Sequence, residues 1–237
     1  MLTNLLVSLK MSFTAKLISK EPVTHNVNRY RFARPDGYIF TPGQATEIAI
    51  NTPDRNSDFH PFTFTGYTDD SFLEFTIKSY PVKDFPNHSG MTETLSKLIP
   101  GDEILIQDPW DTFNYSGEGV FIAGGAGITP FIAILKDLAR KDMIGNNMLI
   151  FSNKTAKDVI YKEEFKKIFS GNPSNFINTY TQETVDVFES GRIDKEMISK
   201  YVTDFSKPFY ICGPKQMKVD IADMLSSLGA KVERIYF

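Results

Sequence analysis

The stretch of sequence that decides the fold is Gly119–Arg140, which reads GVFIAGGAGITPFIAILKDLAR. Val120–Ala123 is an uninterrupted apolar run, typical of a strand buried on both faces of a parallel sheet. The run ends in Gly124-Gly125-Ala126-Gly127, where the backbone can turn tightly and approach a ligand. Thr129 can then cap a helix, and Pro130 fits the first turn of that helix. Strand, glycine turn and helix N-terminus together predict a phosphate site built from backbone N–H groups.

This glycine turn differs from the two commonest phosphate-binding loops. It is not a Walker A loop, because no Gly-Lys-Ser/Thr follows the glycines. It departs from the Rossmann Gly-x-Gly-x-x-Gly because Pro130 stands in place of the third glycine. A plain glycine-rich turn in a nucleotide-free α/β domain is the alternative interpretation. The three glycines, the cap and the proline together favour phosphate binding.

Composition excludes several classes of protein. The 237 residues suit two small domains or one large one, and the net charge of −3 without long basic blocks speaks against nucleic-acid or anionic-membrane binding. No apolar run approaches the ~18–20 residues that a membrane span needs. Cys212 is the single cysteine, so we expect neither a disulfide framework nor a metal or iron–sulfur site held by cysteines of this chain. We expect a reducing, cytoplasmic location, and we assign no role to residues 1–10.

The two halves of the chain have different periodicities. From Phe13 to about Asp108, short alternating segments such as Leu73–Lys78 are separated by turn residues, with one helix at Met91–Leu98. This pattern predicts a small antiparallel β-barrel, which we place at residues 11–112. After the join at Pro109–Gly119, strands alternate with helices. That rhythm predicts a doubly wound parallel α/β domain, which we place at residues 117–237.

The elements expected in the second domain follow from apolar runs and helical periodicity. We expect further strands at Met148–Phe151, Phe176–Tyr180 and Phe209–Cys212. We expect helices at Lys162–Phe169 and Glu196–Tyr201, and a last helix that opens at Pro214 and ends at Gly229.

Four further segments suit a bound nucleotide, although each also has a plain structural interpretation. They are the aromatic strand His60–Thr65, the strand end Ile77–Tyr80, the helix start Gly90–Thr92 and the strand-to-helix turn Cys212–Met217. Alone, they indicate core packing, a half-exposed aromatic, an ordinary helix cap and a small buried thiol. In order with Gly125-x-Gly127-x-x-Pro130, they resemble the ferredoxin/flavodoxin–NAD(P) reductase-like flavoprotein family from about Phe13 to the end.

The resemblance implies that the barrel binds FAD. His60 stands where the family has an arginine that pairs with the FAD pyrophosphate, and Phe62 where a tyrosine lies against the flavin. Thr63 stands where a hydroxyl faces flavin N5. His60 lacks the bidentate fork of arginine, so we expect a weaker, pH-sensitive grip on the phosphate. The other residues that the resemblance places at the FAD are Pro61, Ile77, Lys78, Tyr80, Gly90, Met91 and Thr92.

The resemblance implies that the second domain binds NAD(P) with a cysteine near the nicotinamide C4. Cys212 has that place, and no His or Asp partner is near it in sequence, so we expect it to shape the pocket rather than act as a nucleophile. Thr63 and Cys212 are thus the expected catalytic residues. The other residues implied at the nucleotide are Gly124, Gly125, Gly127, Ile128, Thr129, Pro130, Ser152, Asn153, Lys154, Gly213, Pro214 and Met217.

The sequence leaves the choice between NADPH and NADH open. Ser152-Asn153-Lys154 offers no acidic residue for a ribose diol, which slightly favours the 2′-phosphate of NADPH, with Lys154 and Arg192 as candidate partners. Against this, Thr181-Gln182 stands where the NADP-dependent members carry Ser-Arg. The terminal Phe237 fits either stacking on the flavin or packing in a last strand.

The resemblance predicts an FAD-dependent oxidoreductase that takes a hydride from NADPH or NADH. It would pass electrons to a small carrier protein such as flavodoxin or ferredoxin. Two alternatives stay open: an electron-transfer subunit of a larger oxidoreductase complex, and a non-redox nucleotide-binding module that has lost the flavin.

Overall fold

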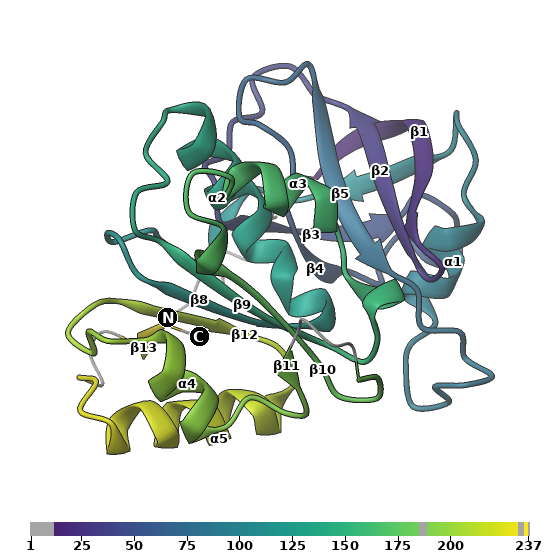
Figure 1. Ribbon diagram of the computed structural model, residues 1–237. Coiled ribbons are helices and arrows are strands. Elements are labelled where there is room, and N and C mark those ends of the chain that lie inside the picture. The colour runs from purple at the N-terminus through teal and green to yellow at the C-terminus, as the bar shows by residue number, and fades with distance from the viewer. Residues whose placement is uncertain (1–11, 185–188, 232–234, 237) are drawn as a thin grey trace, which may run out of the picture.

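The computed structural model describes residues 12–184, 189–231 and 235–236, which form two units side by side (Figure 1). The first is an antiparallel barrel, and the second is a parallel sheet with helices on both faces. This confirms the predicted fold class. The extension at residues 1–10 and the terminal Phe237 lie outside the described residues.

In the described part of the chain, seven strands form the barrel sheet in the order β4-β3-β6-β1-β2-β5, with β7 paired to β3. The sheet closes through a bridge between Phe64 and Phe75. The helix that sequence periodicity predicts at Met91–Leu98 is present as α1. The elements are β1 (Phe13–Thr24), β2 (Val27–Ala33), β3 (Gln44–Ile50), β4 (His60–Thr63), β5 (Phe72–Lys78), α1 (Met91–Lys97), β6 (Glu103–Ile106) and β7 (Trp110–Asp111).

Aromatic side chains fill the barrel because alternate residues of its strands point inward. Tyr30 and Phe32 of β2 are almost completely buried, and Phe32 and Phe75 touch edge to face with ring centroids 6.2 Å apart. Phe64 lies between Phe75 and Phe40, with centroids 5.0 and 4.2 Å away. This packed interior leaves the outer face and the open ends of the strands for ligand binding.

The second unit is a parallel sheet in the order β11-β10-β9-β8-β12-β13 among the described strands. The strand order reverses at β8, because β9 pairs on one side and β12 on the other. Open α/β sheets bind ligands at the carboxyl edge beside such a reversal. The elements are β8 (Val120–Gly124), η1 (Gly125–Ile128), α2 (Thr129–Arg140), β9 (Met148–Asn153), η2 (Ala156–Asp158), α3 (Lys162–Ile168), η3 (Pro173–Asn175), β10 (Phe176–Tyr180), β11 (Glu189–Ser190), α4 (Lys195–Tyr201), β12 (Phe209–Cys212), α5 (Lys215–Ser227) and β13 (Ile235–Tyr236).

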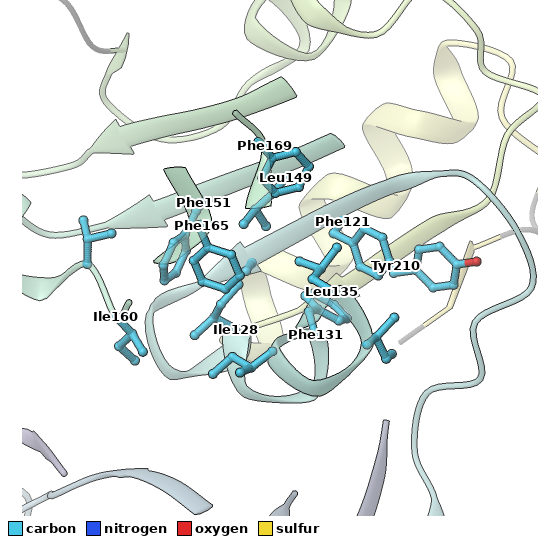
Figure 2. Packing of buried hydrophobic residues seen from close by; sticks show 14 of the residues in the cluster. Phe121, Ile128, Phe131, Leu135, Leu149, Phe151, Ile160, Phe165, Phe169 and Tyr210 are labelled. Atoms are coloured by element: carbon cyan, nitrogen blue, oxygen red, sulfur yellow. The ribbon is translucent and has the colours of Figure 1, made fainter. Parts of the chain in front are cut away.

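Two apolar clusters hold the helices on the parallel sheet. On the face toward the barrel, Phe121 and Phe151 of the sheet pack with Phe131 and Leu135 of α2 and with Phe165 of α3 (Figure 2). On the opposite face, α4 and α5 pack against the sheet (Figure 1). Because α2 lies between the sheet and the barrel, it is buried on nearly all sides. None of the described helices combines the length and the apolarity that a membrane crossing requires.

The two units meet through polar as well as apolar contacts. Lys136 of α2 reaches the barrel and donates to the carbonyl of Thr65 at 3.3 Å. The hydroxyls of Thr76 and Tyr161 lie 3.0 Å apart across the same boundary. At the surface, Arg140 forms an ion pair with Asp69 at 2.7 Å. These contacts fix the orientation of the glycine turn relative to the barrel.

Candidate functional site

The larger cavity, of about 790 Å³, lies where the barrel meets the carboxyl edge of the parallel sheet. It brings together most of the residues that the sequence implied at the nicotinamide nucleotide. The barrel contributes Lys78, Tyr80 and Phe85. The second unit contributes Gly124, Gly125, Gly127, Ser152, Asn153, Lys154, Thr181, Arg192, Cys212, Gly213, Pro214 and Met217, among others.

The three glycines of the turn do different things. Gly125 has a φ of +52° and open space where a side chain would stand, so its backbone is accessible to a ligand. A methyl group on Gly124 would lie 2.4 Å from the Met217 sulfur, and one on Gly127 would lie 2.3 Å from the Cys212 carbonyl oxygen. Gly127 therefore allows the turn to pack closely on the Cys212 carbonyl, and Gly124 leaves room for the Met217 side chain of α5, while both glycines still line the cavity.

The predicted helix cap at Thr129 is wrong. The chain enters helical geometry earlier, in the 3₁₀ turn η1, and Thr129 already has helical dihedrals of −58° and −40°. A capping side chain needs an extended residue, so Thr129 cannot act as the cap. Its hydroxyl instead donates to the Ala126 carbonyl at 3.0 Å and braces the glycine turn. Pro130 does occupy the first turn of α2, as expected.

Cys212 ends β12 at the wall of this cavity. Burial raises the pKa of its thiol, against smaller opposing effects of Lys218 and the Gly213 backbone N–H. The thiol is therefore neutral at physiological pH. A neutral thiol is a poor nucleophile, which agrees with the expectation that Cys212 shapes a pocket.

The end of β9 gives the cavity polar character. Asn153 is 5% exposed, and its side-chain amide has no hydrogen-bond partner among the described residues. A buried, unpaired amide costs free energy unless a ligand or water satisfies it, so this wall suits a polar ligand. Lys154 and Arg192 line the same cavity and suit an anionic group. From the barrel, burial lowers the pKa of Lys78, while Asp158 raises it and Lys154 lowers it further.

A smaller cavity of about 210 Å³ lies on the barrel and brings together most of the residues implied at the FAD. Tyr80 lines both cavities, so the two adjoin. Thr92 accepts a hydrogen bond from the Tyr80 N–H at 3.1 Å, which ties α1 to the end of β5. The residues lining the smaller cavity are His60, Pro61, Phe62, Tyr80, His88, Ser89, Gly90, Met91 and Thr92.

Some residues implied by the resemblance lie outside both cavities. Ile77 is 4% exposed and packs in the barrel core. Ile128 and Pro130 are also buried, beneath the glycine turn. Thr63 ends β4 directly after Phe62 but lines neither cavity. These positions follow from strand and helix periodicity, which turns neighbouring side chains to opposite faces.

Sequence patterns did not predict the partners of His60 and Tyr80 near the two cavities, which are Asp58, Phe85 and His88. His60 donates from Nε2 to Asp58 at 2.8 Å, a contact that fixes the orientation of its ring. His88 stacks on Tyr80 with ring centroids 4.8 Å apart, and Phe85 meets both rings edge-on. The residue pair Asp58 and His60 was visible in the sequence at a spacing of two. The His88–Tyr80 stack depends on a loop path that no local pattern signals.

Comparison with known proteins identifies the two units. Residues 14–115 match the oxidoreductase FAD-binding domain, and residues 121–223 match the oxidoreductase NAD-binding domain. NADH-cytochrome b5 reductase 3 of Rattus norvegicus is 27% identical over 241 residues, which cover 87% of this chain and 79% of that protein. The reductase component of propane 2-monooxygenase from Rhodococcus jostii is 26% identical over 231 residues, which cover 92% of this chain. The chain spans 60% of the length of that reductase component.

Solved structures share the whole architecture. The cytochrome b5 reductase domain of Ulva prolifera nitrate reductase superposes with a TM-score of 0.83, at 21% identity, over 96% of this chain and 97% of that one. A ferredoxin NADP+ reductase from Neisseria gonorrhoeae with bound FAD and NADP gives a TM-score of 0.72, at 19% identity, over 92% of each chain.

Fold, cavities and domain matches together define an oxidoreductase with an FAD-binding barrel and an NAD-binding α/β domain. The chain belongs to the ferredoxin–NADP reductase-like flavoprotein family. It is an NAD(P)H-dependent flavin oxidoreductase. The open backbone at Gly125 and the unpaired amide of Asn153 fit a bound dinucleotide.

Proposed function

We propose that this enzyme passes the electrons of NAD(P)H through FAD to a small redox carrier protein of the flavodoxin or ferredoxin kind. The observation that carries the proposal is the adjoining pair of cavities, which share Tyr80 at the boundary of the FAD-binding and NAD-binding domains. Bound FAD supplies the chemistry that accepts a hydride as an electron pair and releases electrons singly.

The chain's own residues position the reactants and exclude water in this proposal. Gly125 offers accessible backbone to the phosphates of the dinucleotide. The neutral thiol of Cys212 provides a small, uncharged wall for the nicotinamide. Thr63 follows the cavity-lining Phe62 in β4 but lines neither cavity, so its hydroxyl has no part in this arrangement. Tyr80 and Phe85 cover the junction with aromatic surface, which favours a dry site.

A second candidate is that the chain serves as the electron-transfer subunit of a larger oxygenase complex. The observation that favours it is the match over 92% of this chain to a reductase component of a monooxygenase. With one cysteine, these 237 residues cannot themselves supply the ligands of a four-cysteine iron–sulfur cluster.

The first test is the visible spectrum of the purified protein, recorded before and after anaerobic addition of NADPH and, separately, NADH. Flavin absorption that bleaches with either nucleotide supports the reductase half of the proposal. A protein that stays colourless and unreactive after FAD is added would contradict it. That result would favour a non-redox nucleotide-binding module.

The acceptor half needs a separate measurement. The reduced protein is mixed anaerobically with purified flavodoxin, ferredoxin or cytochrome b5, and reoxidation of the flavin is followed. Rapid one-electron reoxidation by flavodoxin or ferredoxin supports the proposed carrier. If cytochrome b5 alone reoxidises it quickly, the carrier assignment is wrong while the reductase half still holds.

A further inference from the structure

Arg55 lies in the turn between β3 and β4, beside the smaller cavity. Its Nη1 donates to Asp58 Oδ2 at 3.2 Å and to the Ser89 carbonyl oxygen at 3.3 Å. Ser89 and Gly90 line the cavity, and a methyl group added at Gly90 would lie 3.6 Å from Arg55 Nη2. The guanidinium group therefore lies directly behind one wall of the cavity. Its side chain is 27% exposed, so it has room to turn toward a ligand.

One carboxylate links Arg55 to His60. Asp58 binds His60 through Oδ1 at 2.8 Å and Arg55 through Oδ2 at 3.2 Å. The two cationic heads are thus held on the two oxygens of the same group. Arg55 and His60 therefore lie near the same end of the smaller cavity, and a positive charge at either position can act there.

The charge inventory of the cavity shows why this position matters. The described residues that line it include two histidines, His60 and His88, but no lysine or arginine. The diphosphate of FAD carries two negative charges, which a permanent cation with several donors matches best. His60 already gives its Nε2 proton to Asp58, so a neutral His60 ring would turn the lone pair of Nδ1 toward any other partner. A guanidinium group, by contrast, is a cation with several donors whatever hydrogen bonds its neighbours make.

We propose that Arg55 supplies the permanent positive charge for the FAD diphosphate, in place of the arginine that is missing at position 60. Both hydrogen bonds of Arg55 use Nη1, which leaves Nη2 and Nε for phosphate oxygens. Asp58 orients both cations before the cofactor arrives. The inference rests on the proposed function, because it requires FAD at this cavity.

The rival explanation is purely structural: Arg55 could merely hold the Ser89 loop in place. The two explanations differ in which ligands they affect. A charge that binds phosphate affects FAD but not riboflavin, which has no phosphate. A loop brace affects both ligands, because both present the same ring system to the protein.

The test measures binding of FAD and of riboflavin to apoprotein, by quenching of flavin fluorescence, in the full chain. We expect Arg55→Ala to weaken FAD binding about 10- to 100-fold, the usual range for a lost charged hydrogen bond. Riboflavin binding should stay within twofold. The double variant Arg55→Ala with His60→Arg should recover most of the FAD affinity, because the guanidinium group at position 60 supplies the positive charge that position 55 has lost. Lys16→Ala, which removes an exposed cation on β1, is the matched control and should change neither.

Each result bears on the inference. Unchanged FAD binding in Arg55→Ala, or an equal loss for FAD and riboflavin, would overturn it. If Arg55→Ala does not fold, Arg55→Gln replaces it, because glutamine keeps a donor for Ser89 without the charge. The same comparison of FAD and riboflavin binding then applies to Arg55→Gln. An unaltered protein that does not bind FAD would overturn the proposed function, and the inference with it. FAD binding in the unaltered protein with no effect of Arg55 would overturn the inference alone.

Discussion

Lys136 of α2 and Glu74 of β5 lie 3.4 Å apart, from Nζ to Oε1, and form a buried ion pair across the domain boundary. Their side chains are only 8% and 4% exposed. Glu74 also accepts from Arg31 at 3.1 Å, and Lys136 lies 3.5 Å from Glu164. Buried pairs contribute little net stability, since desolvation offsets their attraction, but removal of one partner leaves a charge without compensation.

Glu74 is the partner whose loss should cost most. Glu74→Leu removes the buried carboxylate that Lys136 and Arg31 share. It leaves the buried Lys136 with only the more exposed Glu164 as an ion-pair partner among the described residues, and we expect a loss of about 3–5 kcal/mol of unfolding free energy. Arg140→Ala removes the exposed interdomain pair with Asp69 and serves as the control, with an expected loss of at most about 1 kcal/mol. Urea denaturation measures both. Equal losses in the two variants would contradict the view that burial makes the difference.

Cys212→Ala should slow reduction of the flavin by NAD(P)H about tenfold while FAD stays bound. The shorter side chain leaves a gap in the wall of the nucleotide cavity, and small errors in the position of a reactant are costly. Stopped-flow bleaching of the flavin measures the rate. Cys212→Ser keeps the size of the side chain and should retain most of it. An unaltered rate in Cys212→Ala would show that Cys212 does not contribute to the nicotinamide pocket.

Replacement of both Lys154 and Arg192 by alanine should lower kcat/KM for NADPH relative to that for NADH. Both cations line the nucleotide cavity, and only NADPH carries a 2′-phosphate for them to bind. Loss of charged hydrogen bonds predicts a fall in the ratio of about 10- to 100-fold. Lys167→Ala on the exposed side of α3 is the control. A ratio that does not move would show that neither cation contacts the phosphate.

Tyr30 should make the barrel sensitive to alkali. Burial raises the pKa of Tyr30 from its ordinary value of 10.0 to about 12. Because the folded state keeps the proton longer, the stabilisation is complete below pH 10 and is lost as pH rises through 12. The stability difference between the unaltered protein and Tyr30→Phe should therefore shrink by about 1–3 kcal/mol over that interval. Urea denaturation at pH 9, 10 and 11 checks the slope, with about half of this change expected by pH 11, and a stability difference that does not vary with pH would contradict it.

Local patterns were enough to predict the architecture. Alternation in Leu73–Lys78 and the apolar run Val120–Ala123 correctly indicated an antiparallel barrel and a parallel sheet, because burial imposes these periods directly. The glycine turn was found where expected, but the role of Thr129 was wrong, since a 3₁₀ turn had already begun the helix.

Contacts between distant segments could not be predicted in the same way. Lys136 and Glu74 are 62 positions apart, and the contact of Arg55 with Ser89 spans 34 positions. Neither pair has a local signature. Lysine, glutamate and arginine usually lie solvated at the surface, and nothing in the neighbouring sequence marks these residues as different. The candidate site was thus predictable as a set of strand ends and turns, whereas its charge arrangement required the fold.

Gly127 and Cys212 impose a constraint on how this enzyme can be altered. Because Gly127 has no side chain, the Cys212 carbonyl oxygen can lie 2.3 Å from the point where a Cβ would stand, and the turns after β8 and β12 pack in direct contact. Any loop that carries a side chain at position 127 would place its Cβ against the Cys212 carbonyl oxygen unless the β12–α5 connection also moved. In natural and in engineered variants alike, the turn after β8 and the turn after β12 are therefore expected to change together.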